Sequence, residues 1–137
     1  MHLKKHLSFT AIRQMIAENF TAIRDSRGAN SSNTIADVML SGLACMYYQS
    51  PSLLEFQRRM EKREQRNNLR SMFTVKDLPT DQGMRNIIDK VDSQASFRPI
   101  FKELFSKLQR GKHLEQYQTL PSNSKYGLYG STKNFLY

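Results

Sequence analysis

The chain has few of the residues, cysteine, glycine and proline, that are abundant in disulfide-bonded or repetitive proteins. It has a single cysteine, Cys45, so no disulfide framework can form within it, and a reduced cytosolic setting is expected. Six glycines and four prolines among 137 residues exclude collagen-like and linker-like chains. The most apolar stretch covers residues 35–48 and contains Asp37, whereas about 20 apolar residues are needed to cross a bilayer. We therefore expect a soluble, cytoplasmic protein without a membrane partner.

Recognisable catalytic and metal-binding patterns are also missing. The three histidines and the cysteine have no zinc-ligand spacing, and there is neither a Walker A lysine motif nor a Gly-x-Ser-x-Gly elbow. Cys45 lies in the most apolar segment, which favours a buried structural thiol over a reactive one. After Asp92, the only acidic residues are Glu103 and Glu115. We therefore predict no catalytic residue, no metal site, no cofactor and no small-molecule substrate.

What the chain has in excess is positive charge. It carries 21 Lys and Arg against 12 Asp and Glu, a formal net charge of +9. The excess lies in residues 51–75 and 96–137, which is more consistent with basic faces than with an even solubilising scatter. An anionic partner such as nucleic acid is therefore favoured, although charge says nothing about fold.

Apolar spacing predicts a mainly α protein. Helices are expected over about residues 8–24, 34–48, 52–66, 80–91 and 96–111, with a further turn near 69–73 and Pro99 in the first turn of the last helix. Thr34, Ser52 and Thr80 are placed to cap three of them. In the last helix the apolar stripe is expected to be core; it comprises Phe97, Ile100, Phe101, Leu104, Phe105 and Leu108. The tail after residue 120 lacks helical spacing and reads as a short β-like strand or hairpin. The fold class is five to six helices in one small domain with that C-terminal strand.

The most informative stretch is a run of cations in the third predicted helix. If residues 52–66 are one helix, its five cations lie within an arc of about 140°, next to a narrow apolar stripe. Such a face can follow DNA phosphates. The alternative is a solvated face, in which Glu55 pairs with Arg58 or Arg59 and two further glutamates dilute the charge. The candidate DNA-binding residues are Arg58, Arg59, Lys62, Arg63 and Arg66. A second basic set decorates the predicted helix over 96–111, where a solvated face is the better interpretation.

Three motifs in order carry a family resemblance. They are Ser52-Leu53-Leu54-Glu55-Phe56-Gln57-Arg58-Arg59, Leu78-Pro79-Thr80-Asp81-Gln82-Gly83-Met84-Arg85, and Phe97-Arg98-Pro99-Ile100-Phe101. The sequence resembles, over roughly residues 36–120, the N-terminal part of bacterial insertion-sequence transposases of the DDE, RNase H-like class. The resemblance implies a helical DNA-binding region, residues 1–120, ahead of a catalytic domain that would use a divalent metal such as Mg²⁺.

The same resemblance implies that the chain lacks the family's chemistry. In the family, the first catalytic strand ends in Asp-Gly-Thr and an aromatic residue, and that Asp binds metal. When Thr132 and Phe135 are aligned with this motif, Gly130 stands in place of the Asp. Glycine has no side-chain ligand for the metals of two-metal phosphoryl transfer. Residues 121–137 are thus expected to be a poorly ordered remnant of the first catalytic strand.

Two functions remain open after this comparison. The first is a truncated, catalytically inactive transposase fragment that binds DNA, either without sequence preference or at element ends. The alternative is a small helical protein-interaction module that associates with an intact transposase subunit or another partner. An exposed apolar patch on the order of several hundred Å² would favour the second function.

Overall fold

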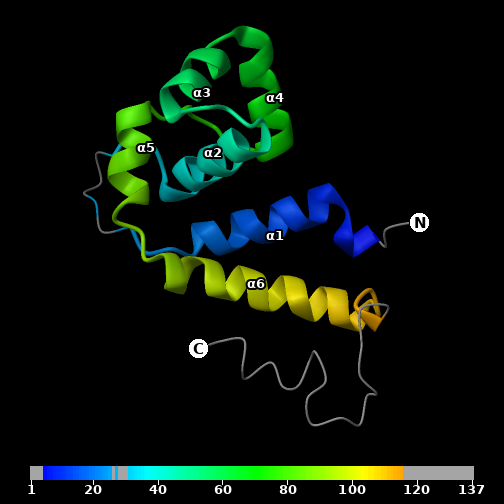
Figure 1. Cartoon of the computed structure of the whole chain (residues 1–137). Helices are drawn as coiled ribbons and strands as arrows, with labels where there is room; N and C mark the ends of the chain where they lie inside the picture. The colour runs from blue at the N-terminus through cyan, green and yellow to red at the C-terminus, as the bar shows by residue number, and fades with distance from the viewer. Residues whose placement is uncertain (1–4, 26, 28–30, 116–137) are drawn as a thin grey trace.

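The computed structural model describes residues 5–25, 27 and 31–115 of the chain. The residues that it describes form a mainly α structure of six α-helices and one short 3₁₀ helix, without strands (Figure 1). Its elements are η1 (Lys5–Leu7), α1 (Phe9–Thr21), α2 (Ile35–Tyr47), α3 (Leu53–Met60), α4 (Arg63–Phe73), α5 (Asp81–Ile88) and α6 (Ser93–Arg110). The strand predicted over residues 121–137, including the comparison at Gly130, lies outside the described residues.

Side-chain caps set where most of the helices begin. The hydroxyls of Thr34, Ser52 and Thr80 accept the backbone N–H three residues on, at 3.0–3.1 Å, which confirms the three predicted caps. The last helix was predicted to begin at Ser96, and that is wrong. Asp92 caps α6 by accepting the N–H of Ala95 at 3.1 Å, so the helix begins at Ser93 and Pro99 lies inside it.

The predicted helix over residues 52–66 is in fact two helices. α3 ends at Met60, and α4 begins at Arg63 after a two-residue connection, then continues through the predicted turn to Phe73. At about 100° per residue, an unbroken helix would direct Leu69 and Phe73 roughly opposite to Phe56 and Met60. The break lets both pairs enter one core, where each of the four side chains is at most 1% exposed.

The core is built around α2, the most buried helix, which packs against α1, α3, α4 and α5 (Figure 1). Val38 and Ala44 of α2 are fully buried, and Met84 of α5 meets them in the same cluster. Gly42 faces α5, and a Cβ at that position would lie in ordinary contact with Cδ1 of Ile88, at 3.5 Å. The apolar spacing that predicted α1, α2 and α5 therefore identified the faces that meet.

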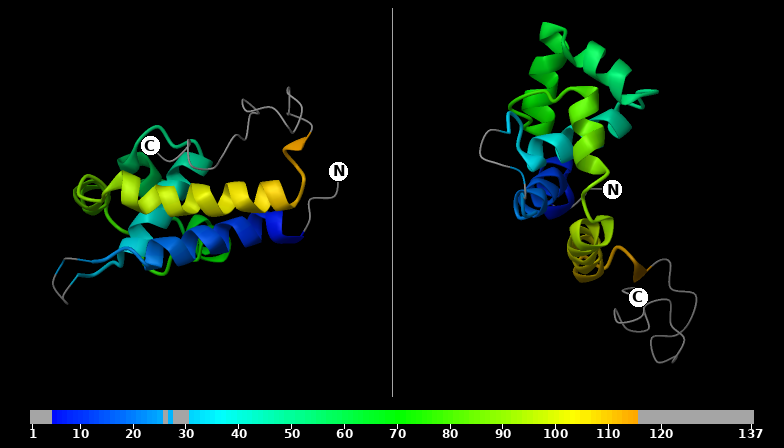
Figure 2. Two further views of the ribbon diagram at one scale, coloured as in Figure 1. Left: turned by 90° about the horizontal axis from the view of Figure 1, so that it is seen from below. Right: turned by 90° about the vertical axis from the view of Figure 1, so that its left-hand side faces the viewer.

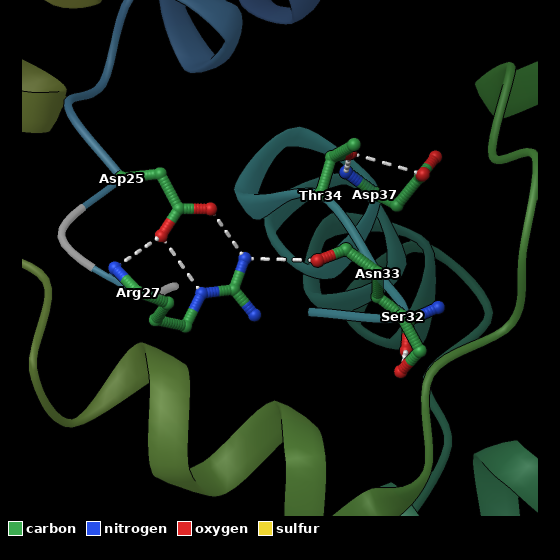
Figure 3. A network of polar contacts seen from close by, with 6 residues as sticks. All are labelled: Asp25, Arg27, Ser32, Asn33, Thr34 and Asp37. Atoms are coloured by element: carbon green, nitrogen blue, oxygen red, sulfur yellow. Dashed lines mark hydrogen bonds and ion pairs between the residues drawn. The ribbon is translucent and has the colours of Figure 1, made fainter. Parts of the chain in front are cut away.

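A buried carboxylate ties the start of α2 to the segment that links α4 to α5. Asp37 is 6% exposed; one of its oxygens accepts the backbone N–H of Lys76, and the other accepts the hydroxyl of Thr34, both at 3.0 Å. Asn33 reaches the same segment, because its amide donates to the carbonyl of Asp77 at 3.1 Å. Figure 3 shows the contact of Thr34 with Asp37 beside the Asp25–Arg27 pair, whose guanidinium also donates to the carbonyl of Asn33.

α6 lies at the edge of the molecule, antiparallel to α1 and away from α3 and α4 (Figures 1 and 2). Its packing is chiefly against α1 and η1. α1 and η1 cover only part of the wide apolar stripe of α6. Ile100 is buried and Leu104 half-buried, whereas Phe97, Phe101 and Phe105 are 37%, 54% and 44% exposed. The prediction that the whole stripe is core is therefore wrong for the three phenylalanines. None of the helices described here is long and apolar enough to cross a membrane.

Candidate nucleic-acid interface

The five cations predicted to bind DNA lie around the connection between α3 and α4. We call this set the basic corner; it comprises Arg58, Arg59, Lys62, Arg63 and Arg66. The first two belong to the last turn of α3, Lys62 is the N-cap residue of α4, and the other two lie in the first turns of α4. All five are exposed. The structure brings them together at the end of the molecule farthest from α6 (Figure 1).

The helix break changes how these charges are presented. A single cationic face over residues 58–66 is wrong, because the two helices meet at an angle that the connection sets (Figure 1). The N-terminus of α4 has no side-chain cap, so its first N–H groups face outward without a side-chain acceptor. Their partial positive charge adds to that of the cations, whereas Glu64 in the same turn opposes it.

Few acids neutralise the basic corner. Within the described part of the chain, none of its five cations forms an ion pair, and the predicted pairing of Glu55 with Arg58 or Arg59 does not occur. Arg66 donates to the backbone carbonyl of Glu61 at 3.4 Å, while the Glu61 carboxylate accepts from the Gln57 amide at 2.9 Å. The positive charges therefore remain available to a ligand.

Two further cations extend the corner, and the sequence interpretation missed both. Arg66, Arg70 and Lys76 line a groove of about 300 Å³ between α4 and the segment that precedes α5, together with Glu61 and Asp77. On α4, the cations at 63, 66 and 70 lie within an arc of about 60°. That i, i+3, i+7 spacing is visible in the sequence, but it becomes a face only once a helix is known to begin at residue 63.

Aromatic rings border the basic corner on the side of α1 and α2. Arg59 lies over the ring of Tyr48, with its Cζ 5.4 Å from the centroid, within the range of a cation–π contact. Tyr47 packs edge-on to Tyr48 at 5.4 Å, and Phe9 lies 5.7 Å from Tyr47. Phe73 lies beneath them, buried and within 6 Å of each of the three rings. Burial raises the pKa of Tyr48, helped by Tyr47 and opposed by Arg59, so its hydroxyl stays neutral near pH 7.

The second basic set lies on α6, distant from the first. Arg98, Lys102, Arg110 and Lys112 are exposed, in agreement with a decorated outer face. Lys107 differs, because it turns toward the core side with a side chain only 23% exposed and pairs with Glu103 at 3.4 Å. This set therefore forms a separate, partly neutralised surface.

A cleft of about 610 Å³ lies where α1, α5 and α6 come together. Its walls are mostly apolar, with Ile23, Ile87 and Val91 among them, and Asp25 and Arg27 lie at its edge. These two residues form an ion pair at 2.6 Å, and hydrogen bonds from Arg27 hold the pKa of Asp25 below its usual range. The pair is a structural link in the connection between α1 and α2.

Reactive groups are sparse in the part of the chain that the structure describes. No three of its His, Cys, Asp or Glu residues come together where they could hold a metal ion. Cys45 is buried, as predicted, with its thiol 4.0 Å from the carbonyl of Ser52, and burial raises the pKa of this thiol. A raised pKa keeps the thiol protonated and poorly nucleophilic.

No protein-family model, no curated protein and no solved structure matches this chain.

Proposed function

We propose that this chain is a DNA-associated helical domain of the transposase type, which binds the DNA backbone through the basic corner. The observation that carries the proposal is the clustering of five exposed cations around the α3–α4 connection, none of them in an ion pair with any residue that the structure describes. The resemblance of residues 36–120 to transposases supports it. We propose further that the chain does not itself cut DNA, because Gly130 stands where the family has a metal-binding Asp.

Binding of this kind has a measurable salt dependence. Each phosphate neutralised by a lysine or arginine releases condensed counterions, so log K falls against log salt concentration with a slope of about −0.9 per contact on duplex DNA. Five contacts from the basic corner would give a slope of up to about −4.5 on that basis. Phosphate contacts position a protein on DNA without reading its sequence, so little sequence preference is expected from this surface.

A pair of charge-matched variants tests the proposal. The first replaces Arg58, Arg59, Lys62 and Arg63 with Gln, and the second replaces four exposed cations at the far end of the molecule, Arg98, Lys102, Arg110 and Lys112. Both lose four positive charges. The second variant also removes the exposed ion pair of Lys112 with Glu115, at 3.8 Å, and such a surface pair contributes little to stability, so the variants differ chiefly in where the charge is removed. Labelled duplex DNA is titrated with each variant at several salt concentrations. We expect the slope of log K against log salt concentration to become shallower by about 3.6 in the corner variant and to stay unchanged in the α6 variant. Equal effects, or no wild-type binding at low salt, would refute the proposal.

A second function is favoured by the phenylalanines of α6. Phe101 is 54% exposed, and Phe97, whose ring packs edge-on against Phe20 of α1 at 5.9 Å, is still 37% exposed, so α1 leaves part of this apolar surface uncovered. Exposed apolar surface of this kind marks protein-interaction sites. We propose as the alternative that α6 docks on an intact transposase subunit. Cosedimentation with such a subunit should be lost in Phe101→Glu and kept in Met46→Glu, a matched exposed position on α2; retention in both would exclude α6 as the docking surface.

A further inference from the structure

We propose that the nucleic-acid interface includes a stacking surface for unpaired bases, formed by Phe9 and Tyr47 beside Arg59; the proposal rests on the DNA-binding function proposed above. We call the three rings of Phe9, Tyr47 and Tyr48 the aromatic platform. The preferred ligand is then DNA in which unpaired bases adjoin a phosphate backbone held by the basic corner, rather than a fully paired duplex.

The platform presents ring surface in a fixed arrangement. Tyr47 is 54% exposed and Phe9 is 45% exposed, although their ring centroids lie only 5.7 Å apart. Both rest on Phe73, which is 1% exposed and lies 5.4 Å and 5.9 Å from them. Rings held from below in this way are pre-organised, so stacking a base on them costs little conformational entropy. Every base has a π face, so such a surface is tolerant of sequence.

The platform is continuous with the basic corner. Tyr48 joins the two, because its ring contacts Tyr47 at 5.4 Å on one side and the guanidinium of Arg59 at 5.4 Å on the other. A strand whose phosphates lie along the corner therefore has its bases within reach of Tyr47. In a duplex the base faces are covered by their neighbours, so only unpaired bases can use the rings. Aromatic rings next to cations that follow the backbone are the usual composition of single-strand binding surfaces.

The charges around the rings favour an anionic ligand over an apolar one. Arg13 lies one turn after Phe9 on α1 and donates to the hydroxyl of Thr74, the residue after Phe73, at 3.4 Å, so a second cation lies near the platform. The acids nearest to Arg59 along the chain are Glu61, two residues after it, and Glu55, one turn before it, and both are exposed to solvent. An apolar protein partner would have to cover these guanidinium groups, whereas a phosphodiester chain would pair with them.

A single fluorophore can report on the stacking. The chain contains no tryptophan, so Tyr47→Trp introduces one indole at the platform. Three labelled DNAs are compared: a blunt duplex, the same duplex with a short single-stranded overhang, and that duplex with an abasic overhang. We expect the overhang to quench the indole and to bind at least about 5-fold more tightly than the blunt duplex. The abasic overhang, which keeps the phosphates but lacks the bases, should do neither.

Two variants separate stacking from general packing. Tyr47→Leu keeps an apolar side chain over Phe73 but has no π face, and we expect it to lose the preference for the overhang. Met46→Leu changes the adjacent residue, which is 77% exposed and belongs to none of the ring contacts, and should keep the preference. Circular dichroism confirms that each variant keeps its helices.

The outcomes distinguish this inference from the function on which it rests. If blunt duplex binds with the expected salt slope but the overhang adds neither affinity nor quenching, the stacking surface is refuted and the DNA-binding function stands. Failure to bind any of the DNAs refutes both. An indole signal that changes with protein concentration in the absence of DNA would show that the platform is a self-association surface, and would also overturn the inference.

Discussion

Removing the carboxylate of Asp37 should destabilise the fold by more than any surface change nearby. The carboxylate accepts one hydrogen bond from the backbone of Lys76 and one from the hydroxyl of Thr34, both at 3.0 Å, in a site only 6% exposed. Hydrogen bonds to a charged group contribute about 1.5–3 kcal/mol each. Both donor residues are exposed and can be rehydrated after the change, so the lower figure applies.

We therefore expect Asp37→Ala to lower the free energy of unfolding by about 3 kcal/mol. Asp37→Asn should lose about half of that, roughly 1.5 kcal/mol, because its amide keeps one oxygen for the N–H of Lys76 but cannot accept from Thr34 with its nitrogen. At about 4 °C per kcal/mol for a chain of this size, Tm should fall by roughly 12 °C and 6 °C, respectively.

Urea titration followed by circular dichroism at the helix band measures both variants. Asp77→Ala is the matched control, since Asp77 is exposed and its carbonyl, not its carboxylate, accepts from Asn33. The control should stay within about 0.5 kcal/mol of the parent chain. If Asp37→Ala is as stable as the control at an unchanged m-value, the carboxylate does not tie α2 to the segment before α5, and the reasoning fails.

Three smaller predictions follow from single positions. Gln49 follows the C-cap of α2 with φ 51°, in the left-handed region, and the N–H of Ser50 donates to the carbonyl of Cys45. Gln49→Gly should therefore raise the free energy of unfolding by about 1 kcal/mol, measured by thermal unfolding. Gly42→Ala should also raise stability, by about 0.8 kcal/mol of helix propensity, because its Cβ would lie at an ordinary contact distance of 3.5 Å from Ile88. Gly42→Leu should instead lower stability by about 1–3 kcal/mol through overpacking. A leucine variant more stable than the alanine variant would contradict the α2–α5 contact. The buried Cys45 thiol, whose pKa burial raises, should react with a disulfide reagent far more slowly in the native chain than in urea, and equal rates would contradict its burial.

Much of the helical order could be predicted from local chemistry. Thr34, Ser52 and Thr80 cap helices because a side-chain oxygen three residues before a free N–H satisfies it whatever the distant chain does. The five cations of the basic corner were singled out because they are concentrated within nine residues of a predicted helix, although Glu55, Glu61 and Glu64 lie among them or close by in the sequence. The structure places these five cations close together, although the single helix predicted over residues 52–66 is two helices.

The burial and the neighbours of residues that pack against a second helix could not be predicted from local sequence. α3 and α4 separate because Phe56 and Leu69 both enter one core, and only packing against α2 makes that a requirement. Phe97 and Phe101 have helical spacing typical of core residues, yet they remain exposed because α1 covers only one side of α6. Arg66 and Arg70 are neighbours on one face of α4, whereas Lys76 meets them only across the groove that the folded chain creates.

The sequence by itself determined the composition of the molecule: helices, their caps, an excess of cations and a single thiol in an apolar helix. Each of these follows from interactions within a few residues or from the residue type alone. Tertiary structure decided which apolar residues are covered and which rings lie beside which charges. The contact of Arg59 with Tyr48, and through it with Tyr47 and Phe9, joins three helices, and no local pattern encodes it. Burial and juxtaposition are shared properties of several elements, so they exist only once those elements pack.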